Sequence, residues 1–370
     1  MKTPLIVLHV LGRLNRGGAE TLIMNLYRTI DRSKVQFHFV KHTNEKCAYD
    51  DEIISLGGKI HVIERYTGIN HFIYVRLWKK LLKTNPEYTI IHGHIRSTAS
   101  IYLLLAKKFN RITIIHSHAT GSRGNLISRS VKNVMQLPIR YISDYFFACS
   151  EEAASWLFGK KKVSDTLILK NAINAETFRY DDKIRKKFRR SYGLENKLVL
   201  VHVGSFTKPK NHIFLLAIFK EILHKKNDTM LLLVGEGDLK QNLIERISAD
   251  KLFDSVLFLG SRDDIPNILM GADAFIFPSI FEGFGIAALE AQASGLPTHV
   301  SDVLPTEIKA TDLLFYHSLK KSAKEWAQEI IDNKIEHRSD RVDSIKELGY
   351  DIVVQTNILK EFYLKLTMEY

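Results

Sequence analysis

Short apolar runs recur along the chain, and stretches with apolar residues at helical spacing separate most of them. In the first half these runs predict β-strands at 5–10, 35–40, 59–63, 88–92, 111–116, 145–148 and 166–169. In the second half they predict strands at 197–203, 230–234, 256–259, 274–277 and 298–300. Strands that alternate with helices predict an α/β fold with two doubly wound parallel sheets, in which ligands bind beyond the carboxyl ends of the strands.

A charged segment without an apolar run, residues 175–196, separates the two series of strands. Its composition is typical of a linker with a surface helix. The sequence therefore predicts an N-terminal Rossmann-like domain at 1–174 and a C-terminal Rossmann-like domain at 197–349. Residues 350–370 again carry apolar residues at helical spacing, which predicts a helix at the end of the chain.

The composition is that of an ordinary globular protein. The chain has 370 residues, of which 45% are hydrophobic and 25% charged, so it is long enough for two cores. The sequence has no apolar run long enough to span a membrane, and its first apolar stretch is interrupted too early for a signal peptide. We therefore expect a cytoplasmic protein. Its two cysteines, Cys47 and Cys149, predict neither a disulfide framework nor a zinc site.

Charge is distributed unevenly along the chain. Residues 1–194 contain 33 Lys and Arg against 15 Asp and Glu, a net charge of +18, whereas the remainder carries −6 of the total of +12. The basic half suggests a polyanionic partner, either nucleic acid or an anionic membrane leaflet.

One helical stretch in this half has apolar residues beside basic ones. The apolar positions are Tyr74, Leu77, Trp78, Leu81 and Leu82, and the basic positions are Arg76, Lys79, Lys80 and Lys83. This pattern fits a membrane-facing amphipathic helix, and it equally fits a core helix with a solvated basic side.

The most informative segment is EGFGIAALEAQASGLP, residues 282–297. It follows a predicted strand, passes through a loop with two glycines, and enters a helix-forming stretch that stops at Gly295 and Pro297. The first amides of such a helix lack partners, and the helix dipole favours an anion there, so a phosphate is expected. Glu282 and Glu290 lie roughly 12 Å apart at about 1.5 Å per residue, which suits the two ends of one extended ligand.

The Glu-x7-Glu spacing, with Pro278 and Ser279 before it and GLP after it, resembles the signature of family 4 retaining glycosyltransferases with the GT-B fold. The resemblance implies two Rossmann-like domains that face each other across a cleft, and a C-terminal helix that crosses back to the first domain. It also implies that Glu282 contacts the donor sugar, that Glu290 holds the ribose hydroxyls, and that the amides from Phe284 through Gly285 to Ile286 receive the diphosphate.

A second loop of the same domain carries part of the family pattern. After the predicted strand at 197–203, the sequence Gly204-Ser205-Phe206-Thr207-Lys208-Pro209-Lys210 leads to a helix. The family usually has an Arg after this Gly and a Lys before the helix, and both bind the diphosphate. Lys210 matches, but Ser205 stands where the Arg is expected. Three alternatives remain for the function of that Arg. Lys208 replaces it, Ser205 replaces it with a single hydrogen bond, or no residue replaces it.

The first domain also has candidate ligand positions. Gly17 and Gly18 follow the first strand and open a helix, which resembles the glycine loop of the family on the side of the cleft opposite the donor. A His at the end of the strand at 111–116 commonly reaches the donor sugar in the family. His116 fits this position best, and His118 is the alternative. His92 and His94 end the preceding strand, but no Cys or carboxylate lies near these histidines at ligand spacing, so no zinc is expected.

The resemblance implies a retaining glycosyltransferase that uses a nucleotide-diphosphate sugar, with a UDP-sugar as the expected donor. The basic first half and the habits of the family indicate a lipid-linked oligosaccharide acceptor at the inner membrane face, in capsule or exopolysaccharide synthesis. No Asp-x-Asp occurs in the sequence, so we expect no metal and no other cofactor. Two alternatives remain. One is a nucleotide-sugar-binding protein without turnover; the other is a nucleic-acid-binding protein that uses the basic half, although no nucleic-acid-binding motif is recognisable and no nucleic acid is expected.

Overall fold

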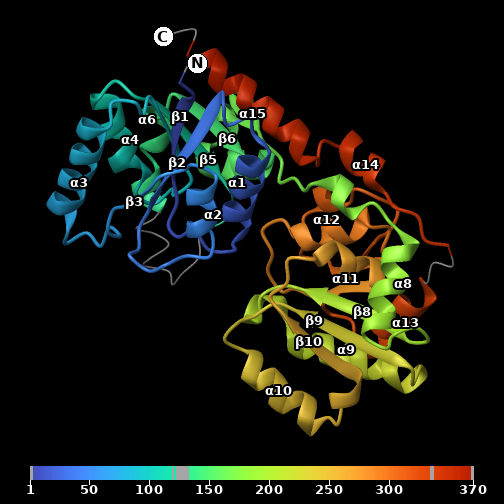
Figure 1. The fold of residues 1–370 in the computed structure, drawn as a ribbon. Helices are drawn as coiled ribbons and strands as arrows, with labels where there is room; N and C mark the ends of the chain where they lie inside the picture. The colour runs from blue at the N-terminus through green and yellow to red at the C-terminus, as the bar shows by residue number, and fades with distance from the viewer. Residues whose placement is uncertain (1–2, 119–120, 122–132, 334–336, 368–370) are drawn as a thin grey trace. The chain divides into compact units, whose positions relative to one another are not determined.

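The computed structural model describes residues 3–118, 121, 133–333 and 337–367. Contacts within the chain divide it into two compact units (Figure 1). Unit 1 comprises residues 1–172 and 352–370, and unit 2 comprises residues 173–351. Residues 368–370 of the expected C-terminal helix lie outside the described part of the chain.

Unit 1 contains a seven-stranded parallel sheet within its described residues, in the order β3-β2-β1-β4-β5-β6-β7. Its strands are β1 (Leu5–Val10), β2 (Val35–Lys41), β3 (Ile60–Val62), β4 (Ile90–Gly93), β5 (Ile112–Ser117), β6 (Tyr145–Ala148) and β7 (Thr166–Ile168). Its helices are α1 (Gly18–Thr29), α2 (Asp50–Ser55), α3 (His71–Thr84), α4 (Ala99–Lys108), α6 (Ile139–Ile142), α7 (Glu151–Phe158), the short η1 (Lys160–Lys162) and the C-terminal α15 (Ile352–Leu366). Each strand predicted in the first half of the sequence is therefore present, with ends that differ by at most two residues.

Unit 2 contains a six-stranded parallel sheet within its described residues, in the order β10-β9-β8-β11-β12-β13. Its strands are β8 (Leu198–Val203), β9 (Thr229–Val234), β10 (Val256–Gly260), β11 (Ala274–Phe277), β12 (Thr298–Ser301) and β13 (Leu314–His317). Its α-helices are α8 (Asp182–Ser191), α9 (His212–Lys225), α10 (Lys240–Ala249), α11 (Ile265–Gly271), α12 (Ile286–Ala293), α13 (Ala323–Asp332) and α14 (Val342–Glu347). Short 3-10 turns are η2 (Ala175–Phe178), η3 (Lys208–Lys210), η4 (Phe253–Ser255) and η5 (Thr306–Ile308).

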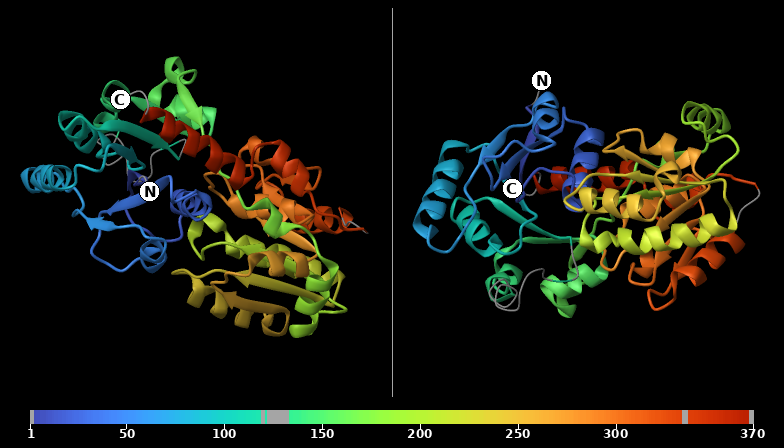
Figure 2. Two further views of the ribbon diagram at one scale, coloured as in Figure 1. Left: turned by 45° about the horizontal axis from the view of Figure 1, so that its top comes forward. Right: turned by 90° about the horizontal axis from the view of Figure 1, so that it is seen from below.

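In each unit the helices cover both faces of the sheet, as the views in Figure 2 show. In unit 1, alternate residues of β1 contribute to two cores: Val7 joins the core under α1 and α15, and Leu8 the core under α3, α4 and α7. Because both faces are covered, the strands are apolar almost throughout, as parallel strands generally are. The helix α15 lies against α1 and therefore forms part of unit 1 although it ends the chain (Figure 1).

The charged segment 175–196 forms part of unit 2. Phe178 of η2 and Phe188 of α8 are buried in the core beneath α11 and α12. Asp181 caps α8 by accepting hydrogen bonds from the amides of Lys183 and Ile184. Basic residues occupy the solvent side of α8, and this explains why the sequence of this segment has no apolar run.

The apolar positions of α3 that fitted a membrane face prove to be core residues. Tyr74, Trp78, Leu81 and Leu82 are buried against the sheet and α4, with the Trp78 ring stacked on Tyr102 at 5.1 Å. The interpretation of this face as membrane-binding is therefore wrong, because the helical spacing here serves the core of unit 1.

We predict that Trp78→Ala destabilises the protein by about 3–5 kcal/mol, because it removes a fully buried aromatic side chain and leaves a cavity. Phe72→Ala is the matched control on the same helix, since the Phe72 side chain is 85% exposed; its effect should stay within about 0.5 kcal/mol. Urea denaturation of both variants measures the difference, and equal effects would contradict the assignment of the buried face.

Candidate active site

The sheet of unit 2 changes winding direction between two neighbouring strands. From β8 the chain proceeds to β9 and β10 on one side, and it returns with β11, β12 and β13 on the other. Ligands of doubly wound sheets bind at such a switch point, outside the carboxyl ends of the two strands. The loops that follow β8 and β11 occupy this position, and they carry Lys210 and the 282–285 segment.

The loop after β11 delivers free amides to the start of α12. Gly285 precedes the helix with φ +88°, a left-handed conformation that favours glycine. A Cβ atom at this position would lie 3.0 Å from Leu304 Cδ2 and 3.2 Å from Ile308 Cδ1. No described residue accepts a hydrogen bond from the amides of Phe284, Gly285 or Ile286. The loop therefore has the geometry of an anion-binding helix start.

Lys210 and Glu282 form an ion pair across the two loops. Both side chains are largely buried, with 18% and 17% exposed, and the Lys210 ammonium also lies 4.5 Å from the centre of the Phe277 ring. Two further bonds join the same loops. The Ile280 amide donates to the Pro209 carbonyl at 2.8 Å, and the Asn211 side chain donates to the Pro278 carbonyl at 3.1 Å. The two loops thus form one connected structure around the switch point.

Glu290 lies on α12 and is partly buried. Burial raises the pKa of its carboxyl group to about 8. No described residue forms a hydrogen bond with this carboxyl group, which leaves it available to the hydroxyl groups of a ligand. Phe284, at the other end of the loop, packs on the core with its ring 5.6 Å from that of Tyr350.

Ser205 is exposed, and its hydroxyl lies 3.3 Å from that of Thr207. It has no cationic group, so at this position the loop has no counterpart of an arginine.

The loop after β9 approaches the same region closely. A Cβ at Gly235 would lie 2.1 Å from the Gly204 carbonyl oxygen, and one at Gly237 would lie 2.6 Å from that of Phe206. These glycines permit backbone packing between the loops.

In unit 1, Gly17 and Gly18 open α1 as predicted. The carboxylate of Glu20 already lies at this helix start, because a Cβ at Gly17 would be 2.3 Å from Glu20 Oε2. Burial raises the pKa of Glu20. A Cβ at Gly18 would meet no atom within 4 Å, so the space beside Gly18 is open. Any ligand of these amides therefore shares the helix start with an acidic side chain.

Five histidines gather at the switch point of unit 1, between β1 and β4 and along β5. They are His9, His92, His94, His116 and His118. His9 and His92 are paired in register, and the period of two along a strand directs His94, His116 and His118 to the same face of the sheet. The sequence analysis names four of them and misses His9, since nothing near His9 in the sequence marks it.

Ring nitrogens link these histidines in a chain. His9 Nδ1 lies 2.9 Å from His94 Nε2, and His94 Nδ1 lies 2.8 Å from His118 Nε2. His92 Nδ1 lies 2.5 Å from the hydroxyl of Tyr363 on α15. Neither nitrogen of His116 has a partner among the described residues. His116 therefore keeps both ring nitrogens available.

Burial keeps the five histidines uncharged. It lowers the pKa of His9 to about 3 and that of His118 to about 4. Burial and the neighbouring histidines hold the pKa values of His92, His94 and His116 well below the ordinary range. At neutral pH this surface therefore offers neutral donors and acceptors, which suit the hydroxyl groups of a sugar.

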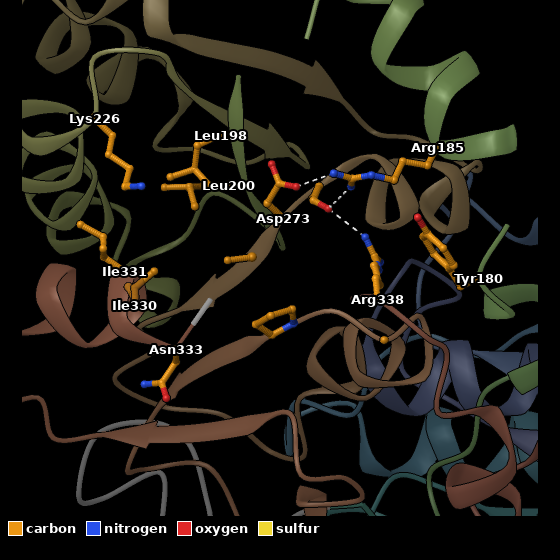
Figure 3. A pocket seen from close by; sticks show the side chains of 14 residues that line it. Tyr180, Arg185, Leu198, Leu200, Lys226, Asp273, Ile330, Ile331, Asn333 and Arg338 are labelled. Atoms are coloured by element: carbon orange, nitrogen blue, oxygen red, sulfur yellow. Dashed lines mark hydrogen bonds and ion pairs between the residues drawn. The ribbon is translucent and has the colours of Figure 1, made fainter. Parts of the chain in front are cut away.

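Unit 2 has a further cavity of about 430 Å³, at the amino ends of β8 and β11 (Figure 3). Arg185, Arg338 and Asp273 lie on one side of it, and Leu198 and Ile330 on the other. The Arg338 guanidinium donates all its hydrogen bonds to Ser294 and to the carbonyls of Leu269, Met270 and Ala272. With its donors already occupied, Arg338 holds the ends of α11 and α12 together, which is a structural role.

The structure thus brings Ser205, Lys210, Glu282, Phe284, Gly285, Ile286 and Glu290 to neighbouring loops and the first turns of one helix in unit 2. Gly17, Gly18 and His116 lie in unit 1 at the carboxyl ends of its strands. Asn211, Glu20 and Tyr363 also contact these positions, and local sequence patterns do not predict them, because their contacts depend on loop geometry or on residues distant in sequence.

Two doubly wound parallel-sheet units, with a glycine loop and a helix start at the switch point of the second, are the architecture of GT-B glycosyltransferases. Solved structures agree with this fold. The Anabaena protein Alr3699/HepE, crystallised with UDP, matches with a TM-score of 0.71 at 16% identity and covers 99% of this chain and 98% of its own. The lipopolysaccharide glycosyltransferase WaaG matches with a TM-score of 0.67 at 14% identity, covering 96% and 95%.

Sequence comparisons give the family. Residues 16–177 match the model described as Glycosyltransferase Family 4, and residues 184–341 match that of Glycosyl transferases group 1. The putative glycosyltransferase EpsF of Bacillus subtilis is 32% identical over 96% of both chains. The capsular polysaccharide biosynthesis glycosyltransferase CapH of Staphylococcus aureus is 26% identical over 98% of this chain and 99% of its own. The chain belongs to glycosyltransferase family 4, as the Glu-x7-Glu segment predicted.

We predict that Glu290→Gln stabilises the protein more at pH 8 than at pH 5. The folded carboxyl group retains its proton up to about pH 8, whereas the unfolded one loses it near 4.5. The unfolded state therefore gains stability relative to the folded state as the pH rises between these values. Melting temperatures of parent and variant from pH 5 to 8 measure this, with the exposed Glu347→Gln as control. A constant difference across this range would refute the buried, protonated state.

Proposed function

We propose that this enzyme is a retaining glycosyltransferase that transfers a sugar from a UDP-sugar to a lipid-linked oligosaccharide in capsule or exopolysaccharide synthesis. The observation that carries the proposal is the Lys210–Glu282 pair beside the free amides of the α12 start, at the switch point of unit 2. The diphosphate binds to the amides and Lys210, Glu282 contacts the sugar, and Glu290 binds the ribose hydroxyls.

The names of similar proteins support the donor and acceptor. EpsF and CapH point to surface polysaccharide synthesis. An Escherichia coli relative, 27% identical over 60% of both chains, is a UDP-Gal:alpha-D-GlcNAc-diphosphoundecaprenol alpha-1,3-galactosyltransferase, which names a UDP-sugar and a lipid-linked acceptor. The structures of HepE with UDP and with UDP-glucose further favour a uridine nucleotide.

In the proposed reaction, the bond between the sugar anomeric carbon and the diphosphate oxygen breaks, and its electron pair leaves with the diphosphate. The acceptor hydroxyl attacks the same face of the sugar, and its proton passes to the departing phosphate oxygen. Negative charge grows on the leaving group, so positive charge from Lys210 and the helix start lowers the barrier. Because Glu282 is paired with Lys210, we assign it to orienting the sugar and stabilising positive charge on it, with His116 as a further sugar contact.

We further propose that transfer requires no divalent metal ion. A Lys residue and three amides take the place that a metal ion has in enzymes with carboxylate metal sites. Transfer is therefore expected to persist in the presence of a chelator.

A second part of the proposal concerns the membrane. Ile69, Phe72 and Ile73 are 97%, 85% and 57% exposed around the start of α3. The exposed face of the same helix carries Arg76, Lys79, Lys80 and Lys83. Apolar side chains beside cations fit the interface of an anionic leaflet, and unit 1 carries most of the positive charge of the chain. No helix among the described residues has the length and apolar character needed to cross a membrane.

Ser205 favours one alternative, a nucleotide-sugar-binding protein without turnover, because the loop has no arginine to neutralise the leaving group. Measurement of transfer separates this alternative from the proposal. Membership of glycosyltransferase family 4 argues against the nucleic-acid-binding alternative.

Substitution of the two members of the ion pair should change UDP binding in opposite directions. Lys210→Ala is expected to weaken UDP binding and to lower kcat/KM by about 10²–10³-fold, as loss of a charged transition-state donor does. Glu282→Gln is expected to preserve or strengthen UDP binding, because Lys210 loses its competing carboxylate, while transfer falls. Calorimetry with UDP and transfer from radiolabelled UDP-sugars, compared with GDP- and ADP-sugars, measure the two effects.

Lys208→Ala is the matched control for this pair, since Lys208 is an exposed lysine of the same loop. It should change binding and transfer only slightly. Transfer that remains intact in Lys210→Ala, or equal losses in Lys208→Ala and Lys210→Ala, would contradict the site. Binding of UDP-sugars without any turnover by the parent would favour the alternative without transfer.

For the membrane surface, we predict that a variant with Ile69→Ser and Phe72→Ser loses most of its binding to vesicles containing anionic lipid, because two exposed apolar side chains are removed. Vesicle sedimentation at low salt measures the binding. Phe253→Ser, which changes an aromatic side chain of unit 2 that is 56% exposed, is the control and should bind as the parent does. Undiminished binding by the double variant would exclude this surface.

A further inference from the structure

We propose that His94, His116 and His118 form a binding site for a divalent transition-metal ion of the zinc type, and that His9 orients His94 through a hydrogen bond. This ion is not required for transfer; it inhibits transfer by occupying His116, the histidine that the proposed function assigns to the sugar. The inhibition rests on the proposed function, whereas the binding does not.

The first argument is the number of buried nitrogens without partners. Among the described residues, His9 Nε2, His92 Nε2, His118 Nδ1 and both nitrogens of His116 form no hydrogen bond. A buried polar atom without a partner is energetically costly, so five in one cluster indicate a ligand. Neutral imidazole supplies a lone pair, and imidazole nitrogen is a preferred ligand of zinc, copper and nickel.

The second argument is geometry. The triad offers one nitrogen from each of His94, His116 and His118, all within 4.8 Å of one another. Tetrahedral zinc at about 2.0–2.1 Å from each nitrogen needs separations of roughly 3.3 Å. His94 Nδ1 and His118 Nε2 are 2.8 Å apart, so the two rings need to move apart by only a fraction of an ångström.

The third argument is the orientation of His94. If His94 Nε2 donates to His9 Nδ1, 2.9 Å away, the remaining nitrogen of His94, Nδ1, presents its lone pair to the triad. Histidine ligands of metals characteristically donate their second N–H in this way, which fixes tautomer and ring position.

The fourth argument is access. A cavity of about 290 Å³ borders the triad and is lined by His94, Arg96, Ser97, His116, His118 and Leu157. Its volume exceeds the roughly 30 Å³ of one water, so a water or hydroxide can serve as the fourth ligand and offset part of the charge of the ion. The second triad of His9, His92 and His94 shares His94 but lies deeper.

The sequence analysis expected no zinc because no Cys or carboxylate accompanies the histidines at ligand spacing. A site of three histidines and water requires neither. Ligand spacing along the sequence is not needed here, because adjacent strands of the sheet bring distant histidines together. His9 and His94, for example, are 85 residues apart.

The test uses the full chain without a histidine tag. Isothermal titration with Zn²⁺ and the visible absorption of bound Co²⁺ measure binding, and one equivalent with nitrogen ligation is expected. His118→Gln removes a ligand and should abolish the Co²⁺ signal. His9→Gln removes only the orienting contact and should weaken binding by about 10–100-fold. His61→Gln, a histidine outside the cluster that contacts Tyr88, should bind as the parent does.

Circular dichroism verifies that each variant folds. Absence of stoichiometric Zn²⁺ binding by the parent, or equal binding by His118→Gln, overturns the proposal. For the parent, Zn²⁺ should inhibit transfer and a chelator should restore it. Zn²⁺ binding without any transfer activity would refute the proposed function alone, and transfer unaffected by bound Zn²⁺ would refute the inhibition alone.

Discussion

The left-handed turn at Gly285 is the constraint on which the candidate site depends. The residue has φ +88° and lies against Leu304 and Ile308, so a side chain is disfavoured both by the backbone conformation and by the space. This turn directs the amides of Phe284 to Ile286 outward instead of into a further helical turn. Glu282, three residues before this turn, pairs with Lys210 of the neighbouring loop. The anion-binding geometry of the α12 start therefore depends on one backbone conformation, and the ion pair lies beside it.

The ion pair itself couples the two loops electrostatically. Lys210 is neutralised by Glu282, and its ammonium group lies over the Phe277 ring. A largely buried lysine without a counterion is costly, so the pair maintains the loop geometry before a ligand arrives. Under the proposed function, a diphosphate, which carries more negative charge than one carboxylate, would compete with Glu282 for the same ammonium group. Its binding would then free Glu282, the residue that we propose to orient the sugar.

The sequence predicted the fold well because both sheets are covered on both faces. Fully buried parallel strands are apolar throughout, and runs such as 5–10 and 274–277 are found where the pattern places them. The edge strand β13 (Leu314–His317) was not predicted, since four residues of mixed burial give little signal. For α3, periodicity identified the apolar face but not what that face contacts. Burial in a core and contact with a membrane both require apolar residues at the same helical spacing.

The candidate site was predictable where its residues are close in sequence. Glu282, Gly285 and Glu290 lie within one strand-loop-helix unit, so local spacing determines their relation. The pairing of Lys210 with Glu282 depends on two loops whose ion-paired residues are 72 positions apart, which no local pattern encodes. The contact of His92 with Tyr363 spans 271 positions and requires that α15 form part of unit 1.

The two units share a winding pattern yet present different chemistry at their switch points. In unit 2, free amides and a lysine favour a strong anion. In unit 1, burial keeps five histidines neutral although the unit as a whole is basic. The exposed cations of α3 and the buried neutral histidines of the same unit thus differ in charge, and each group suits a different kind of ligand. Recognition of charge and recognition of hydroxyl groups therefore need not fall to the same residues, because the neutral histidines of unit 1 lack the positive charge of the lysine in unit 2.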